Sequence, residues 1–572
     1  MRGEVEMRYT CVRLRSAILA AIISCCITAC GSSDNSDQLT LQVPSPEWQD
    51  QIIYFILTDR FNDGDPTNDN QGAGEFDPTN NAKYSGGDIR GIQQKIAYIH
   101  GLGATAVWLT PPVANQWWDP LVNYGGYHGY WASNFEQVDK HMGSLDDYRQ
   151  LSSALHKSQM YLIQDIVVNH TGDFFFYDGA WNANNPALGW SRNTASVPVT
   201  APTQAPFNMD DPTDPAQRAA GIYHWTPDIS DFGNADQLFN YQLYGLDDLN
   251  TENPVVREAL RSSYGYWIST VGVDAFRIDT AFYVPQAFFS DFMYANDPAA
   301  PGIRQVALSN GKASFLAFGE GFVTDAPYQN ASSVKIESYM VDPGGADVLP
   351  AMLNYPLYGT LWDVLTQQHP TAELGYRIQD MMEVFRRPYL MPTFLDNHDV
   401  DRFLAHGTMA GLQQGLLLIM TLPGIPVIYY GTEQAFTEQR GAMFANGYAS
   451  GGRDHFDTAA PLYQFIAQMA SLRKDNKVFS RGTPAILDQD SAGPGAFAYK
   501  MSYQSTVAIV AVNTSDTATV TRTFATGLPH GTALKSSASV GASSPLSLVV
   551  GADQTVTIAM PPRSAFVWLT AK

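Results

Sequence analysis

Three acidic residues each follow or close a short apolar run of the sequence. Asp279 closes VDAFRID, Glu320 closes SFLAFGE, and Asp399 follows MPTFLDNH. A buried parallel strand carries a side chain to the C-terminal rim of a barrel in this way, and that rim holds the chemistry of such folds. Arg277 lies two residues before Asp279, so the strand period of two points both side chains the same way. A guanidinium there can hold the carboxylate ionised, and the set predicts a catalytic site.

These residues require strands that alternate with helices. Apolar runs alternate with amphipathic stretches such as residues 145–156 and 254–269, which is the α/β pattern. Eight runs of this kind predict a (β/α)8 TIM barrel. In order they are QIIYFILTDRF, ATAVWLT, MYLIQDIVVNH, VDAFRID, SFLAFGE, a weaker run at residues 337–341, MPTFLDNH and IPVIYYG.

The length of the chain calls for more than one domain. Its 572 residues exceed the roughly 250 to 300 at which a single core stops growing. Residues 47–477 hold the barrel pattern, interrupted at about 171–245 by a long stretch without a clear period, which predicts a functional loop or a small inserted domain after the third strand. From residue 478 to 572, Val, Thr and Ser alternate between Gly turns and predict a C-terminal all-β sandwich domain.

The amino-acid composition limits the classes of molecule that the protein is expected to bind. The formal net charge is −22 and no Lys/Arg-rich stripe is present, which disfavours nucleic acid. A neutral polymer is compatible with such an acidic surface. Aromatic residues make up 12% of the chain and suit surfaces that stack on sugars, although most of them are expected in the core.

Residues 1–30 are typical of an export signal. Arg13 and Arg15 precede AILAAIISCCITAC, a run too short to span a bilayer. Its end resembles a bacterial lipobox, which predicts that Cys30 is lipidated; the alternative is an ordinary secretory signal. All four cysteines lie in this segment, so no disulfide is expected in the mature chain. Residues 31–46 are polar, like a flexible tether. Ser32 and Ser33 stand where lipoproteins retained at an inner membrane often carry an acidic residue, so an outer-membrane lipoprotein is favoured; a secreted or periplasmic protein is the alternative.

Six segments, in order, resemble the signature motifs of the α-amylase superfamily (glycoside hydrolase family 13). They are YHGYW (127–131), DIVVNH (165–170), LDDLN (246–250), DAFRID (274–279), FGEGF (318–322) and FLDNHD (394–399). The resemblance covers nearly all of the chain after residue 47. It implies a barrel with an inserted domain after the third strand and a C-terminal β domain.

The resemblance also implies roles for the three acids. Glycoside hydrolysis with retention needs two carboxyl groups roughly 5 to 5.5 Å apart. Asp279 matches the nucleophile and Glu320 the acid/base, whose protonated form an apolar wall of Phe315, Phe318 and Phe322 would favour. Asp399 matches the family's third acid, which holds sugar hydroxyls.

Several other residues match sugar-contacting positions, and some depart from the family pattern. Phe282 and Tyr283 stand where many members carry Lys and His at the acceptor subsite, and Tyr244 and Phe322 match aromatic positions of cyclodextrin-forming transferases. Such aromatics favour stacking of an acceptor sugar, whereas packing is the alternative reading. The remaining predicted substrate-binding residues are His128, Tyr130, Trp131, His170, Arg277 and His398.

Two oxygen-rich groups predict calcium, which prefers carboxylate and carbonyl ligands, whereas no organic cofactor is expected. The first group comprises Asn169, Asp248 and the backbone carbonyl of Tyr283, in the family's interdomain positions. The second resembles an N-terminal calcium loop of cyclodextrin glucanotransferases; the alternative is a turn without an ion. Its members are Asp63, Asp65, Asn68, Asp69, the carbonyl of Gly86, and Asp88.

Three functions remain open from the sequence. The leading hypothesis is a calcium-dependent α-1,4-glucan hydrolase that acts on starch or maltooligosaccharides through a covalent glycosyl-enzyme. The alternative is a glucanotransferase or cyclodextrin-acting enzyme on the same scaffold. A non-catalytic glycan-binding surface protein is a third reading, against which the complete set of Asp279, Glu320 and Asp399 argues.

Overall fold

A computed structural model describes residues 39–543 and 547–570. The segment with the predicted lipobox, Cys30 included, lies outside these residues. Among the described residues, no helix combines the length and the apolar character needed to cross a membrane.

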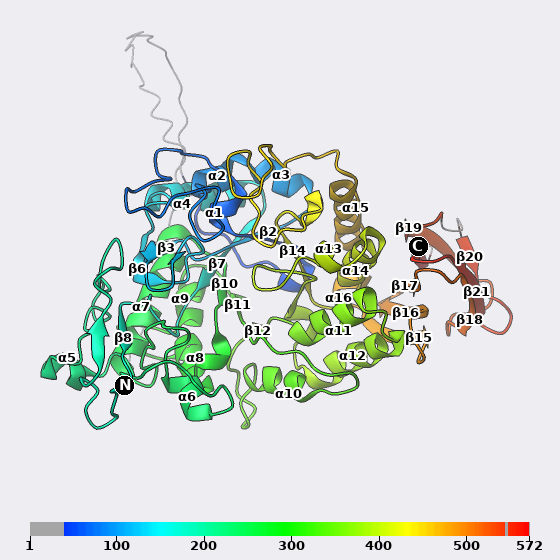
Figure 1. The fold of residues 1–572 in the computed structure, drawn as a ribbon. Coiled ribbons are helices and arrows are strands. Elements are labelled where there is room, and N and C mark those ends of the chain that lie inside the picture. The colour runs from blue at the N-terminus through cyan, green and yellow to red at the C-terminus, as the bar shows by residue number, and fades with distance from the viewer. Residues whose placement is uncertain (1–38, 544–546, 571–572) are drawn as a thin grey trace, which may run out of the picture. The chain divides into compact units, whose positions relative to one another are not determined.

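Eight parallel strands form the central sheet, in the order β12-β11-β10-β7-β2-β1-β14-β13 (Figure 1). The two edges meet where the backbone N–H of Asn354, after β12, donates to the carbonyl of Pro392 in β13 at 3.0 Å. The predicted (β/α)8 barrel is thereby confirmed. Its strands are β1 (Ile53–Ile56), β2 (Ala106–Leu109), β7 (Tyr161–Ile166), β10 (Ala275–Ile278), β11 (Leu316–Gly319), β12 (Ala351–Met352), β13 (Pro392–Thr393) and β14 (Ile425–Tyr429).

The sixth strand lies later in the chain than the sequence suggested. The predicted run at residues 337–341 overlaps the end of helix α10 (Ala331–Ser338), to which its first two residues belong. The true strand, β12, has only two residues. A strand this short shows no alternation, so it leaves no periodic signal in the sequence.

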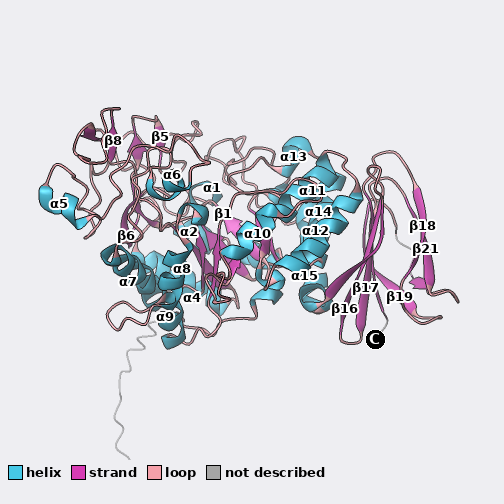
Figure 2. Ribbon diagram, turned by 90° about the horizontal axis from the view of Figure 1, so that it is seen from below, coloured by secondary structure: helices cyan, strands magenta, loops and turns pink. Residues whose placement is uncertain are grey.

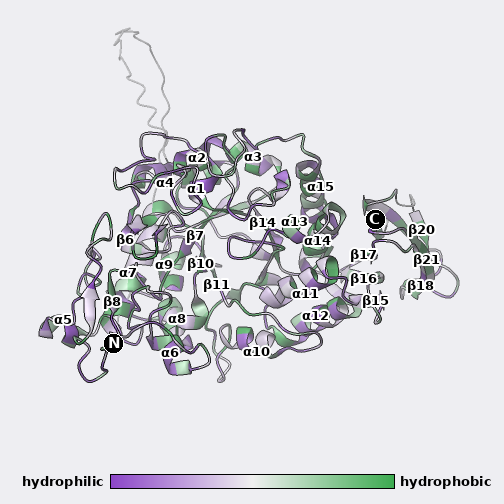
Figure 3. Ribbon diagram, viewed as in Figure 1, coloured by the Kyte–Doolittle hydropathy of each residue, from purple (hydrophilic) through white to green (hydrophobic). Residues whose placement is uncertain are grey.

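Helices surround the barrel and shield strands that are buried on both faces. Hydrophobic residues run along the strands, while the helices show hydrophobic and hydrophilic residues together (Figure 3). A capping box of Ser144 and Asp147 starts α4, and Asn253 caps α7. The helices are α1 (Thr58–Phe61), α2 (Ile89–Gln94), α3 (Ile96–Gly101), α4 (Leu145–Lys157), α7 (Pro254–Val271), α8 (Gln286–Tyr294), α9 (Ile303–Ser309), α10, α11 (Tyr355–Thr366), α12 (Thr371–Val384), α13 (Phe403–His406), α14 (Met409–Thr421) and α15 (Pro461–Asp475).

Long connections follow the second and third barrel strands. After β2 come β3 (Val113–Asn115), β4 (Trp118–Asp119), β5 (Tyr124–Gly125) and β6 (Ala132–Val138). The stretch between β7 and α7, predicted as a functional loop or inserted domain, contains β8 (Phe175–Tyr177), β9 (Trp190–Arg192), α5 (Pro215–Ala220) and α6 (Ala235–Asn240).

The C-terminal part is all β, as predicted, and follows the short helix α16 (Val478–Arg481) (Figure 2). A six-stranded antiparallel sheet and a two-stranded pair share one core, to which Ile509 and Trp568 of the sheet and Phe524 and Ile558 of the pair contribute. The strands are β15 (Thr483–Gln489), β16 (Ala496–Tyr503), β17 (Thr506–Asn513), β18 (Val520–Ala525), β19 (Ala533–Val540), β20 (Ser547–Val549), β21 (Thr555–Met560) and β22 (Ala565–Thr570).

Candidate active site

Arg277, fully buried in β10, binds the acids of the barrel rim together. Its Nη1 lies 2.8 Å from Asp279 Oδ1 and 2.9 Å from Asp165 Oδ1, and its Nη2 lies 2.8 Å from Glu320 Oε2. One planar guanidinium therefore fixes three carboxyl groups from three neighbouring strands. Asp165 was not predicted as a site residue, although a charge inside an apolar strand run is a signal that a buried partner exists.

Strand register explains why Asp279 and Glu320 meet. In the parallel pair β10 and β11, Ile278 is the partner of Gly319, so Asp279 and Glu320 are the next residues in line. Neighbouring strands lie about 4.8 Å apart. That spacing fits the roughly 5 to 5.5 Å between the two carboxyl groups of a retaining glycosidase.

The surroundings of Glu320 are more polar than predicted. The Tyr355 hydroxyl donates to Oε1 at 3.0 Å, and the backbone N–H of Thr280 donates to Oε2 at 3.3 Å. Of the expected apolar wall, Phe315 packs on Phe276 at a centroid distance of 5.0 Å. The carboxyl group is thus held by donors, and Tyr355 is a further site residue without a sequence signal.

The protonation of Asp279 also differs from the expectation. Burial raises the pKa of Asp279 well above its usual value, Arg277 opposes the shift, and Glu320 and Asp165 add to it. Burial likewise raises the pKa of Asp165 to about 6 despite Arg277. A single guanidinium cannot neutralise three buried carboxylates, so the group favours holding a proton. A shared proton at this rim suits acid/base chemistry.

Three buried histidines face the same rim as neutral imidazoles. Burial lowers the pKa of His170 to about 4 and the pKa values of His128 and His398 well below their usual value. Among the described residues, neither His170 Nε2 nor His398 Nδ1 has a hydrogen-bond partner. These nitrogens are free to bind hydroxyl groups of a ligand. Tyr130 stacks on His398 at 5.4 Å and donates to Asp165 at 2.8 Å.

Asp399 meets an arginine that sequence reasoning missed. Arg440 Nη2 lies 3.5 Å from Asp399 Oδ1, and Arg440 Nε donates to the carbonyl of His398 at 3.0 Å. Arg440 lies in the loop after β14, where no local pattern marks it. Arg453, in the same loop, is exposed.

The outer rim carries exposed aromatic side chains. Tyr244 is 77% exposed and lies beside Phe232, and Phe322 is 58% exposed and packs edge-on against Tyr355. Half-buried Trp131 contacts His128 at 5.0 Å. Tyr244 and Phe322 thus present free ring faces at the positions where the sequence predicted acceptor stacking.

Phe282 lies differently from the expectation. Its ring is 5% exposed, packs against Tyr339 at 4.9 Å, and lies so close under Gly321 that a Cβ there would approach it to 2.5 Å. The packing reading therefore fits Phe282 better than the predicted stacking on a sugar.

The predicted N-terminal calcium loop contains buried oxygens without donors. Asp63 Oδ1, Asn68 Oδ1 and Asp69 Oδ1 are buried and have no partner among the described residues. Asp69 lies over Gly86 (φ 105°), where an added Cβ would come within 2.7 Å of its carboxylate. Buried acceptors of this kind fit a hard cation.

Two other members of the loop are already satisfied. Asp88 caps α2 by accepting from the Gly91 N–H at 2.6 Å, and it also accepts from the Asp65 N–H at 2.8 Å. The Asp65 carboxylate pairs with Arg90 at 2.6 Å. Asp63, Asn68 and Asp69 are therefore the side chains of the loop that remain free for an ion.

The second predicted calcium group fits less well. Asn169 and Asp248 are brought together by a backbone bridge between His170 and Asp248, and Tyr283 ends the 3-10 helix η2 (Ala281–Tyr283). However, His224 Nδ1 lies 2.5 Å from Asp248 Oδ2. Although burial opposes it, hydrogen bonds to Asp248 and Glu252 raise the pKa of His224 to about 9, while burial raises the pKa of Asp248 to about 7. His224 therefore competes with an ion for the Asp248 carboxyl group.

The chain is similar to known proteins over most of its length. A beta/alpha-amylase of Paenibacillus polymyxa is 30% identical over 489 residues, which cover 82% of this chain and 34% of that protein. A cyclomaltodextrin glucanotransferase of Klebsiella oxytoca is 30% identical over 469 residues, which cover 76% of this chain and 66% of that protein. The chain thus spans from about a third to just under two thirds of these relatives.

A solved structure and a family model also resemble most of this chain. The crystal structure of an Anoxybacillus alpha-amylase matches with a TM-score of 0.70 and 28% identity, over 92% of this chain and 99% of that chain. The family model of the alpha-amylase catalytic domain matches residues 55–457, from the first barrel strand to the loop beyond the eighth. Together with the acids gathered on Arg277, this match shows that the chain belongs to the alpha-amylase family.

Proposed function

We propose that this protein is a retaining α-1,4-glucan hydrolase that acts on starch or maltooligosaccharides. The observation that carries the proposal is the placement of Asp279 and Glu320 at matched ends of neighbouring strands, both bound by Arg277. A protein that only bound glycans would have no need for this arrangement, which argues against the third reading of the sequence.

The chemistry divides between the two carboxyl groups. The Asp279 carboxylate attacks the anomeric carbon while Glu320 donates its proton to the glycosidic oxygen, so the C–O bond breaks and the leaving sugar departs with that proton. Glu320, now a carboxylate, then takes a proton from water, and the hydroxide oxygen displaces Asp279 from the anomeric carbon. Asp399 and the neutral histidines bind the ring hydroxyls and stabilise the positively charged transition state.

A glucanotransferase is the second candidate, favoured by the exposed rings of Tyr244 and Phe322. In that reaction a sugar hydroxyl replaces water as the acceptor, and stacking on an aromatic ring holds the acceptor in place. The Klebsiella oxytoca relative is a cyclomaltodextrin glucanotransferase, which is consistent with this candidate.

We further propose calcium as the metal of the N-terminal loop. Asp63, Asn68 and Asp69 would hold it with otherwise unpartnered oxygens, and the ion would balance their buried charge. It would stabilise the fold near the start of the barrel and take no part in bond breaking.

Product analysis tests the reaction. The full chain should release short maltooligosaccharides from soluble starch and maltoheptaose, and an Asp279→Asn protein prepared in parallel should not. Longer products from maltoheptaose, or ring opening and coupling of β-cyclodextrin, would favour the transferase. Glucan binding without any new reducing ends would leave the binding protein as the correct reading.

Lipidation and an outer-membrane address are a separate proposal, supported by the sequence around Cys30. The wild-type protein should partition into detergent after expression in a bacterial host, whereas Cys30→Ser should remain in the aqueous phase with the same specific activity. Detergent partitioning that survives the substitution would contradict lipidation at Cys30.

A further inference from the structure

A second group of buried oxygens without donors lies in the long connections after β2 and β7, away from both predicted calcium groups. Asp119 ends β4, Asp173 follows the His170 motif, and Asn193 follows β9. All three are more than nine-tenths buried. Asp119 Oδ2, Asp173 Oδ1 and Asn193 Oδ1 have no hydrogen-bond partner among the described residues.

These three side chains are neighbours in space. The Asn193 amide donates to Asp119 Oδ1 at 3.1 Å and to the carbonyl of Asp173 at 3.0 Å. The Asp119 carboxyl group also lies close enough to Asp173 to raise the pKa of Asp173. Two neighbouring buried carboxylates repel each other, so this group needs either a proton or a cation.

One member of the group borders a cavity. Asp173 lines a cavity of about 580 Å³ whose wall includes Tyr177, Trp181, Asp228 and Tyr244. Burial raises the pKa of Asp173 to about 9, with further contributions from Asp119 and Asp228. Within residues 39–543 and 547–570, Asp119, Asp173 and Asp228 form no ion pair with a Lys, Arg or His side chain.

Other buried acids of this chain show what is missing here. Several of them lie beside a cation, as expected for charges removed from water. The pairs are Asp165 with Arg277, Asp274 with Lys312, Asp139 with His141, Asp248 with His224, and Asp380 with Arg377. The Asp119–Asp173 pair instead shares its pattern of unpartnered oxygens with Asp63 and Asp69 of the N-terminal loop.

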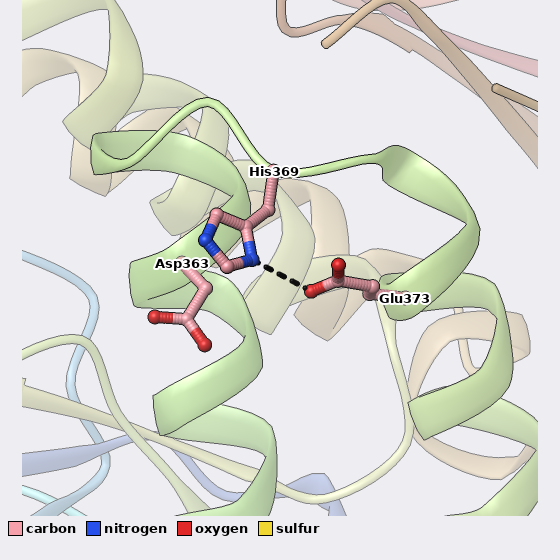
Figure 4. A group of neighbouring side chains, drawn as sticks. All are labelled: Asp363, His369 and Glu373. Atoms are coloured by element: carbon pink, nitrogen blue, oxygen red, sulfur yellow. Dashed lines mark hydrogen bonds and ion pairs between the residues drawn. The ribbon is translucent and has the colours of Figure 1, made fainter. Parts of the chain in front are cut away.

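A cluster with metal-type ligands elsewhere provides a contrast. Asp363, His369 and Glu373, between α11 and α12, place three ligand atoms within 4.8 Å of one another (Figure 4). There His369 Nδ1 already pairs with Glu373 at 3.0 Å, and the imidazole is partly exposed. That cluster has an internal partner and open solvent, so it creates no comparable demand for an ion.

We propose that Asp119, Asp173 and Asn193 form a further binding site for a hard divalent cation, with calcium as the ion of matching chemistry. Two carboxylates supply a charge of −2 and the amide supplies a third oxygen, while water entering from the cavity completes the coordination. Asp119 is the strand partner of Tyr124, and Asp173 lies three residues after His170. The ion would therefore link the connection after β2 to the connection after β7. Both connections carry residues of the candidate active site.

The proposed site can be tested by measuring bound calcium, which requires no glucan substrate. A negative result would therefore not bear on the proposed glucan hydrolysis. The background is the full chain with Asp63→Asn and Asp69→Asn, which removes the N-terminal loop from the count. Adding Asp119→Asn and Asp173→Asn should lower bound calcium by one equivalent after dialysis against micromolar CaCl₂. It should also abolish the corresponding part of the calcium-dependent rise in Tm. Asp228→Asn, which removes a nearby charge but keeps both neighbouring carboxyl groups, is the matched control and should lose no calcium.

Asn193→Asp covers the case in which the double substitution does not fold. A third carboxylate should lower Tm in chelator and enlarge the rise in Tm on adding calcium. If the Asp119–Asp173 pair instead shares a proton, calcium content stays the same in every variant, and Asn193→Asp lowers Tm equally with and without calcium. Either of those results would overturn the proposal.

Discussion

The candidate active site has two parts that are built in opposite ways: the acids gathered on Arg277, here called the floor, and the exposed aromatic residues Tyr244 and Phe322, here called the rim. At the floor, Arg277 is fully buried and binds Asp165, Asp279 and Glu320, each of which comes from a barrel strand or its first residue beyond. At the rim, Tyr244 and Phe322 lie on loops, and their rings are mostly exposed. The floor is fixed by strand register and ion pairs, whereas the rim is fixed mainly by the path of the connecting chain.

This difference separates two kinds of function. Groups that must meet the anomeric carbon with small positional error belong on rigid elements, because a displacement of about 1 Å can cost 10²-fold in rate. Groups that only select what enters after the first bond breaks can lie on exposed loops. We therefore expect substitutions at the floor to change the rate of turnover, and substitutions at the rim to change the products.

Asp279→Asn should have the largest effect. The amide is nearly isosteric and cannot form the covalent intermediate, so kcat on maltoheptaose should fall by on the order of 10⁴-fold or more. The measurement is the initial release of reducing sugar, with Tm as the control for folding. Near-normal activity in a folded Asp279→Asn protein would remove Asp279 from the role of nucleophile.

Glu320→Gln should have the next largest effect, and the effect should depend on the leaving group. Losing the proton donor should reduce kcat on maltooligosaccharides by roughly 10²- to 10⁴-fold. A substrate with a nitrophenol leaving group needs no proton, so the first step should keep much of its rate. An equal loss on both substrates would show that Glu320 is not the acid.

The predicted calcium loop near the N-terminus belongs to neither the floor nor the rim. Substitutions there should therefore change stability and leave the turnover rate and the products unchanged. Chelation should lower Tm, since calcium bound only to the native state at 100 times its Kd adds about 2.7 kcal/mol of stability. Asp69→Asn combined with Asp63→Asn should lower the stability that depends on calcium and leave kcat at 25 °C close to wild type. A large loss of kcat with unchanged Tm would mean that the loop acts on the floor directly.

Much of the floor could be predicted because strand period and strand ends are local signals. The runs before Asp279 and Glu320 gave the right strands, and parallel register alone brings the two residues together. The sixth strand was misplaced because the run at residues 337–341 begins in the last turn of α10, and the true strand β12 has only two residues. Arg440 was not predicted as a site residue because a loop shows no periodic pattern. Its contact with Asp399 depends on closure of the barrel.

The effects of burial could not be predicted from the sequence either. The expectation that Arg277 holds Asp279 ionised counted one arginine against one acid, whereas the structure places three acids around it in a buried site. In the same way, Phe282 had the right chemical type for stacking on a sugar but packs beneath Gly321. The residue type determines which interactions a side chain can make. The tertiary packing determines which neighbouring groups it contacts.

Tyr244→Ala and Phe322→Ala should have the smallest effects and test the rim directly. Each free ring face can bury apolar area against a pyranose ring, which favours a sugar over water when the glycosyl-enzyme breaks down. Removing it should shift the products of maltoheptaose at high concentration toward glucose and maltose, with kcat within a few-fold of wild type. Phe282→Leu is the matched control, because its ring is 5% exposed and should affect Tm more than products. If the ratio of transfer to hydrolysis products stays the same in both rim variants while Tm is retained, the aromatic rim does not select the acceptor, and a simple hydrolase is the better description of this protein.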